Sequence, residues 1–241
     1  MWGIIPAAGT GTRIQPLAFS KELLPVGSRI DEAGIERPRA VSEHLVERML
    51  LAGVTCLCFV ISPWKSDILQ YYGGSIGDVP IAYVIQNQAA GLCDAVFRAV
   101  PFIRPDEAVV IGLPDTVWFP ADALRALPGH QLALLLFPVG KPELFDAVVT
   151  DAAGRVLTIE VKQPQPSTNE VWGAMRMPGE VLHALHRLWL RRERHDEFLG
   201  TLVNAWLAEG GNATAICAGE SYVDVGTLNG YREAMKLLSN E

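Results

Sequence analysis

Short apolar runs alternate with amphipathic stretches along most of this chain, and that alternation limits the possible folds more than any other feature. Runs with the length and composition of buried strands occupy residues 2–7, 55–62, 80–86, 107–115 and 131–139. Helix-like stretches lie between several of them, at 40–52 and 91–100. Parallel strands need such crossovers, since a tight hairpin cannot join them. We therefore expect an α/β fold with a Rossmann-like, mostly parallel mixed sheet flanked by helices.

The pattern changes after residue 140. Two β-rich runs, 146–150 and 155–162, flank a short polar link that ends on a glycine, which predicts an antiparallel hairpin. Helices are then expected at 181–191, 197–208 and 228–238, with a strand at 212–218. No Pro-, Gly- or Ser-rich stretch separates two hydrophobic regions, so we expect one domain over residues 1–241.

Charge argues against nucleic acid and membrane as partners. The formal net charge is −7, which gives no general attraction to polyanions. A basic cluster beside an amphipathic stretch is expected to be a solvated helix end, and it consists of Arg191, Arg192, Arg194 and His195. We see neither a signal peptide nor an apolar run long enough to span a bilayer, and expect a cytoplasmic protein.

A glycine-containing loop follows the first strand directly. Gly9 and Gly11 have no side chains, so backbone N–H groups there can approach a phosphate or a base closely. A Rossmann fingerprint would need a glycine where Ile14 stands, and no GxxxxGK[ST] motif follows the strand. Instead the loop is followed by Arg13 and, eight residues later, Lys21. Two cations there would suit nucleotidyl transfer, because negative charge develops on the leaving pyrophosphate.

The run IIPAAGTGTRIQPLAFSKELLPV, residues 4–26, resembles the signature of the sugar nucleotidyltransferase family, GGxGTRLxPLTxxxPKxLLPV. The resemblance implies that Arg13 and Lys21 are catalytic cations. It also implies a nucleotide-binding loop formed by Ala8, Gly9, Gly11 and Thr12. Ala8 replaces a glycine of the pattern and Ser20 a proline. PAAG is closer to the uridylyltransferases and SKELLPV to the thymidylyltransferases, so UTP and dTTP both stay open.

The resemblance continues along the chain. QNQAAGLCDAV resembles the family's Q-x-x-x-x-G-L element, which implies that Gln86 reads a pyrimidine edge and that Gly91 packs near the base. A glutamine amide offers both a donor and an acceptor for that task. Asp115, after a strand, and Asp224, in YVDVGT, are implied to hold Mg²⁺ between the phosphates. Carboxylate oxygens suit this hard cation, and the carboxyl end of a parallel strand is where open α/β sheets bind ligands.

The sugar-binding half matches less faithfully. TIEVKQP resembles the family's EEKP, which implies that Lys162 contacts the phosphate of the sugar 1-phosphate and Glu160 the sugar hydroxyls. Val161 replaces the second acid of that motif, and Ala147 replaces the glycine of a YGVV element. The further residues implied to line the sugar are Trp172 and Gly173. A missing acid changes which sugar hydroxyls can be bound, because discrimination depends on pairing buried polar groups.

The resemblance therefore implies a Mg²⁺-dependent enzyme that joins a nucleoside triphosphate to a sugar 1-phosphate, glucose 1-phosphate being the family's default. Its nucleotide-binding part would be about 1–140 and its sugar-binding part about 141–241. Two alternatives stay open: a transferase for another sugar or phosphorylated alcohol, and a non-catalytic regulatory protein that binds nucleotide sugars. The extra segment 27–37 is expected at the surface, as an interface or a flap, and a homo-oligomer is left open.

Overall fold

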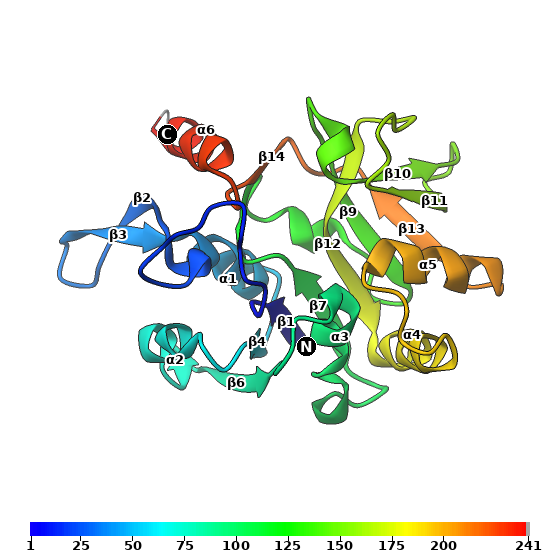
Figure 1. Cartoon of the computed structure of the whole chain (residues 1–241), viewed down its shortest axis with the longest axis horizontal. Coiled ribbons are helices and arrows are strands. Elements are labelled where there is room, and N and C mark those ends of the chain that lie inside the picture. The colour runs from blue at the N-terminus through cyan, green and yellow to red at the C-terminus, as the bar shows by residue number, and fades with distance from the viewer. Residues whose placement is uncertain (240–241) are drawn as a thin grey trace.

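In the computed structural model, which describes residues 1–239, a large mixed sheet runs through the middle of the molecule with helices on both faces (Figure 1). Its central strands are parallel: β1 (Trp2–Pro6) pairs with β4 (Cys56–Ile61) and β7 (Ala108–Gly112), and β4 pairs with β6 (Val79–Ile85). The carboxyl ends of these strands consequently meet at one edge of the sheet. The α/β class expected from the sequence is confirmed.

Helical crossovers join the parallel strands. They include α1 (Val41–Leu51), α2 (Ser66–Tyr72) and α3 (Gly91–Phe97), with the short strand β5 (Ser75–Ile76) after α2. Helix α1 was predicted from apolar residues spaced four apart. These residues form its buried face, where Val41, Leu45 and Met49 are fully buried. Side chains of α1 and α2 pack on one face of the sheet, and those of α3 pack on the other.

The second half of the chain extends the same sheet with antiparallel pairs. β10 (Asp146–Thr150) and β11 (Val156–Val161) form the expected hairpin. The nine-residue strand β12 (Glu170–Pro178) was not expected, and it pairs antiparallel with β7, with β9 (Leu132–Pro138) and with β10. β13 (Ala213–Ile216) runs parallel to β9. β12 thus joins the parallel part of the sheet to the hairpin.

The remaining helices agree closely with the expected ranges. α4 (Gly179–Arg191) and α5 (Leu199–Ala208) pack on the same face as α3, and α6 (Leu228–Leu238) follows a separate two-stranded ribbon. That ribbon pairs β8 (Thr116–Phe119) with β14 (Ser221–Asp224). The basic cluster, which begins at the last residue of α4, is exposed, as expected. Within residues 1–239, no helix is both long and apolar enough to cross a bilayer.

The extra segment forms a β-hairpin at the surface. It spans β2 (Pro25–Ile30) and β3 (Glu36–Ala40), which pair antiparallel. Figure 1 shows the hairpin at the left end of the molecule, with its tip pointing away from β10 and β11. Ile30 is 66 % exposed and Ile35 is 48 % exposed. The expected surface position is therefore observed, while a role as an interface or a flap stays a prediction.

Candidate active site

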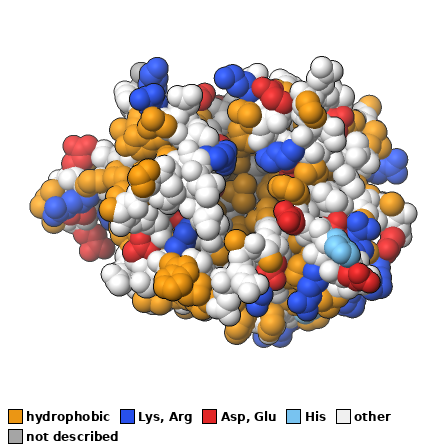
Figure 2. Space-filling view, viewed as in Figure 1, with side chains coloured by type: hydrophobic (Ala, Val, Ile, Leu, Met, Phe, Trp, Pro, Cys, Tyr) orange, Lys and Arg blue, Asp and Glu red, His pale blue; other side chains and the backbone are white. Residues whose placement is uncertain are grey.

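The parallel strands bring the predicted nucleotide-binding residues to one edge of the sheet. The glycine-containing loop follows β1, Gln86 follows β6, and Asp115 lies three residues beyond β7; Lys65, which was not predicted, lies beyond β4. Figure 2 shows this face hollowed in front of β12, with hydrophobic atoms in the floor and Lys or Arg side chains along the upper edge. The fold thus gathers residues that are far apart in the sequence around one hollow.

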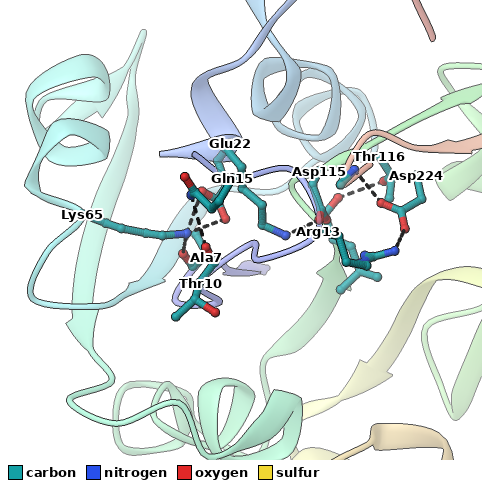
Figure 3. A network of polar contacts seen from close by, with 12 residues as sticks. Ala7, Thr10, Arg13, Gln15, Glu22, Lys65, Asp115, Thr116 and Asp224 are labelled. Atoms are coloured by element: carbon teal, nitrogen blue, oxygen red, sulfur yellow. Dashed lines mark hydrogen bonds and ion pairs between the residues drawn. The ribbon is translucent and has the colours of Figure 1, made fainter. Parts of the chain in front are cut away.

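Each predicted catalytic cation is paired with one of the predicted metal-binding acids (Figure 3). Lys21 Nζ donates a hydrogen bond to Asp115 Oδ2. Arg13 Nη1 donates to Asp224 Oδ2 over 2.9 Å. The Lys21 side chain is 14 % exposed, whereas that of Arg13 is 59 % exposed. The structure therefore brings together four residues that the sequence implied, in one buried and one exposed ion pair.

Gly11 makes room for the lysine. Its φ of +65° is a conformation that glycine adopts readily, and a Cβ at this position would lie 2.7 Å from Lys21 Cδ. The other predicted loop residues differ in exposure, because Gly9 and Thr12 are exposed while Ala8 is buried beneath them. The loop therefore offers backbone at the surface and lets Lys21 pass underneath it to reach the sheet edge.

The two acids converge through the β8–β14 ribbon. Asp224 is the register partner of Thr116, the residue after Asp115, and the Val225 N–H donates to the Asp115 carbonyl over 2.8 Å. A Cβ built on Gly226 would lie 2.8 Å from Asp224 Oδ1 and 3.2 Å from Asp115 Oδ2. Among the described residues, no three His, Cys, Asp or Glu side chains are arranged to hold a metal ion. Two converging carboxylates nevertheless fit Mg²⁺, which takes its remaining ligands from water and substrate phosphates.

Charge coupling keeps the buried pair ionised. Burial alone would lower the pKa of Lys21, but the neighbouring Asp115 and then Glu22 outweigh burial and raise it. Burial alone would raise the pKa of Asp115, but Lys21 lowers it below its usual value. At neutral pH this edge of the sheet therefore holds a buried ammonium beside a buried carboxylate.

A second buried ion pair, which sequence reasoning missed, lies behind the first. Lys65 Nζ donates to both carboxylate oxygens of Glu22 at 2.8 Å and to the Ala7 carbonyl at 2.7 Å (Figure 3). Burial raises the pKa of Glu22 and lowers that of Lys65. Two signals could have found the pair: Glu22 is the residue after Lys21, and Lys65 follows the carboxyl end of a parallel strand. The pair fixes the start of the loop, at Ala7, to the segment that carries Lys21.

Gln86 and Gly91 are in contact with each other. The Gln86 side chain is buried, and its Nε2 donates to Asp94 Oδ2 at 2.7 Å and to the Gly91 carbonyl at 3.2 Å. Gly91 has a φ of +88°, and a Cβ there would lie 2.7 Å from the backbone Cα of Glu197. Only glycine allows that approach without displacing backbone. Reading of a base by Gln86 stays a prediction.

On the predicted sugar-binding side, Lys162 and Glu160 both contact neighbouring segments. Lys162 Nζ donates to the Leu144 carbonyl over 2.8 Å, and its side chain is 49 % exposed. Glu160 accepts hydrogen bonds from the N–H and the hydroxyl of Ser167, at 2.7 and 2.9 Å, so it holds the following loop. Binding of the sugar phosphate by Lys162 and of the sugar hydroxyls by Glu160 stays a prediction.

The other predicted sugar-lining residues are buried at the junction of β10 and β12. Ala147 is fully buried and pairs with Glu160 and Val171, and Trp172 is 6 % exposed. A Cβ at Gly173 would lie 2.6 Å from the rings of Phe137 and Tyr222, which explains the glycine by packing. Beside them lies a buried acid that the sequence pattern did not single out, Asp146.

A model of a protein family described as nucleotidyl transferase matches residues 2–241, and this chain belongs to that family. Curated relatives include the glucose-1-phosphate thymidylyltransferases of Mycolicibacterium smegmatis and Mycobacterium tuberculosis. They are 25 % and 27 % identical over 244 and 246 residues, and each match covers 97 % of this chain and 81 % of the relative.

Two solved structures show the same fold. A protein from Bacillus anthracis, described as a glucose-1-phosphate thymidylyltransferase and crystallised with sucrose, superposes with a TM-score of 0.80 at 23 % identity and covers 99 % of this chain and 95 % of its own. The UTP-bound UGPase of Acinetobacter baumannii has a TM-score of 0.76 at 18 % identity, with 98 % and 92 % covered. At these sequence identities the superpositions show that the folds are alike, and they do not identify the substrates of this chain.

Proposed function

We propose that this chain transfers the nucleotidyl group of dTTP or UTP to a sugar 1-phosphate, with glucose 1-phosphate as the first substrate to test. The observation that supports it most is the double ion pair, Lys21 with Asp115 and Arg13 with Asp224, at the carboxyl edge of the parallel strands. Curated relatives that match nearly the whole chain are named glucose-1-phosphate thymidylyltransferases. One of the two structural relatives was solved with UTP bound.

In the proposed reaction, an oxygen of the sugar phosphate attacks the α-phosphorus of the triphosphate. The bond from that phosphorus to the β-phosphate oxygen breaks, and pyrophosphate leaves without a covalent intermediate on the protein. Lys21 and Arg13 neutralise the charge that develops on the pyrophosphate. Lys162 anchors the attacking phosphate, and Gln86 selects the pyrimidine.

Asp115 and Asp224 would hold Mg²⁺, which when bound supplies positive charge between the phosphates. Both carboxylates are paired with cations in the free protein. On binding of the triphosphate, Lys21 and Arg13 would exchange these partners for phosphate oxygens. The paired arrangement thus keeps the two acids and two cations charged and in place until substrate arrives.

Pyrophosphate release tests the proposal, measured with dTTP and with UTP against a panel of sugar 1-phosphates. Lys21→Met and Asp115→Asn should each lower turnover by about 100-fold or more. Lys236→Met and Asp106→Asn change exposed residues of the same types and should retain full activity. Far-ultraviolet circular dichroism checks that each variant is folded.

Full activity in both site variants would refute the proposed roles. Thermal stabilisation by a nucleotide sugar, without turnover for any substrate pair, would indicate the regulatory alternative instead.

A further inference from the structure

A carboxylate oxygen of Asp146 and the indole N–H of Trp172 lie close to each other in the proposed sugar-binding half, and neither atom makes a hydrogen bond of regular geometry to a described residue. Asp146 is 8 % exposed and Trp172 is 6 % exposed. Within residues 1–239, neither Asp146 Oδ1 nor Trp172 Nε1 has a hydrogen-bond partner. Buried polar atoms of this kind normally find partners, so a pair of them indicates a missing group.

The position of the pair connects it to the least faithful part of the family motif. Asp146 opens β10, and its register partner on β11 is Val161, which stands where the family has its second acid. Side chains of directly opposed residues lie on the same face of a sheet. An acid is thus present at this face after all, on the neighbouring strand.

Contacts around Asp146 link it to the predicted phosphate anchor. Lys162 Nζ lies 3.9 Å from Asp146 Oδ1. On the other side, the first turn of α5 approaches through Gly200, where a Cβ would lie 2.7 Å from Val161 Cγ2 and 3.4 Å from Asp146 Oδ2. The carboxylate therefore lies between Lys162 and the start of a helix.

Burial of this carboxylate does not favour folding. Burial raises the pKa of Asp146, and the opposing effects of Lys162, Trp172 and the Lys162 backbone do not cancel it. A residue chosen for stability alone would be neutral here. The acid is better explained by a ligand that pairs with it.

We propose that Asp146 and Trp172 together bind one hydroxyl group of the sugar 1-phosphate, and that this pair takes the place of the acid missing at Val161. A hydroxyl donates one hydrogen bond and accepts another, which is what an unpartnered carboxylate oxygen and an unpartnered indole N–H require. An ammonium group could satisfy Asp146 but could not accept from Trp172. The pair consequently selects a hydroxyl over an amino group at that ring position. This inference rests on the proposed function.

The first test compares Asp146→Asn and Trp172→Phe with the original chain in pyrophosphate release. Asp146→Asn should lower kcat/KM for the sugar 1-phosphate by about 10- to 100-fold, the effect of losing one charge-assisted hydrogen bond, and Trp172→Phe by about 3- to 10-fold, the effect of losing a neutral one, with the KM for the triphosphate unchanged. If one hydroxyl bridges both groups, the double variant should fall little further than Asp146→Asn alone. Asp106→Asn and Trp64→Phe, at exposed positions, are the matched controls.

Two further readouts separate recognition from a structural role. The melting temperature of Asp146→Asn should equal or exceed that of the original chain, because a buried charge has been removed whose nearest cation, Lys162 Nζ, is 3.9 Å away and half-exposed. With 2-, 3- and 6-deoxyglucose 1-phosphates, the original chain should discriminate against one analogue, and Asp146→Asn should lose that discrimination.

Turnover by the original chain, combined with unchanged kcat/KM and unchanged discrimination in both variants, would overturn the inference and leave the proposed function intact. A lowered melting temperature with no change in discrimination would likewise overturn it, in favour of a structural role. No turnover by the original chain with any substrate pair would reject the proposed function, and this sugar subsite with it.

Discussion

Among individual residues, the two proposed catalytic cations differ most in how closely they are enclosed. Lys21 passes beneath the loop with its Cδ in contact range of Gly11, and its ion pair is largely buried. Arg13 reaches Asp224 from a side chain that is 59 % exposed. An enclosed cation has one geometry available, whereas an exposed one can adjust. The two positions should therefore tolerate replacement by the other basic residue to different extents.

Lys21→Arg should lower kcat by about 100-fold, because the wider guanidinium has no room beneath Gly11. Arg13→Lys should cost about 10-fold, since one charge-assisted hydrogen bond is lost while the charge remains. Steady-state pyrophosphate release measures both. Equal losses in the two variants would contradict the distinction between an enclosed and an adjustable cation.

The Lys65–Glu22 pair leads to a stability prediction. Glu22 is 1 % exposed, so Lys65→Met would leave a buried carboxylate without its cation. We expect the free energy of unfolding, measured in urea, to fall by about 3–5 kcal/mol. The double variant Lys65→Met/Glu22→Leu should recover part of that loss because it removes the stranded charge. A loss below about 1 kcal/mol in the single variant would show that the pair adds little.

At the level of elements, hydrophobic periodicity predicted the helices and strands whose conformation is set by local sequence. The spacing of Val41, Leu45 and Met49 predicted α1, and the apolar run 55–62 predicted β4. The sequence did not predict β12, because Gly173 and Arg176 both lie within it and interrupt its apolar pattern. Its strand conformation depends on β7 and β9, which lie far away in the sequence.

Helix α3 begins at Gly91, which lies against the backbone of Glu197. The cost of this close contact can be measured by comparing alanine variants of Gly91 and Gly53. Gly91 and Gly53 have nearly the same φ, +88° and +85°, but only Gly91 faces backbone, at Glu197; a Cβ on Gly53 would have no neighbour within 4 Å. Gly53→Ala should therefore cost about 1–2 kcal/mol of unfolding free energy from the left-handed conformation alone. Gly91→Ala should cost about 1–3 kcal/mol more, since Glu197 must move. Equal costs in urea unfolding would argue against that close contact.

Across the whole molecule, the site depends on pairings that no sequence pattern reveals. The sequence implied Asp115 and Asp224 as separate acids, and only the β8–β14 ribbon brings them to one point. Likewise, the unpartnered state of Asp146 depends on where β10, β11 and β12 meet. Motifs implied most of the proposed site residues, but the burial and partners that set their chemistry come from the assembled sheet.

Stability of the whole molecule should fall in mild acid because of a histidine remote from the proposed chemistry. His44 of α1 is 2 % exposed, and its Nε2 lies 2.9 Å from the Val26 carbonyl, to which it donates. Burial first, and then the nearby Arg39, lower the pKa of His44 to about 4. In the unfolded chain His44 therefore becomes protonated below about pH 6.5, whereas in the folded protein it stays neutral down to about pH 4.

The stabilisation from this neutral histidine is thus complete above pH 6.5 or so and is lost as the pH falls toward 4. Between pH 7 and pH 4.5 the loss should be about 2–3 kcal/mol. His44→Gln keeps a donor for Val26 but does not titrate, so it should lack this part of the pH dependence. Urea unfolding of both proteins at the two pH values measures the difference between them. If that difference did not change with pH, the acid sensitivity would have to come from the carboxylates instead.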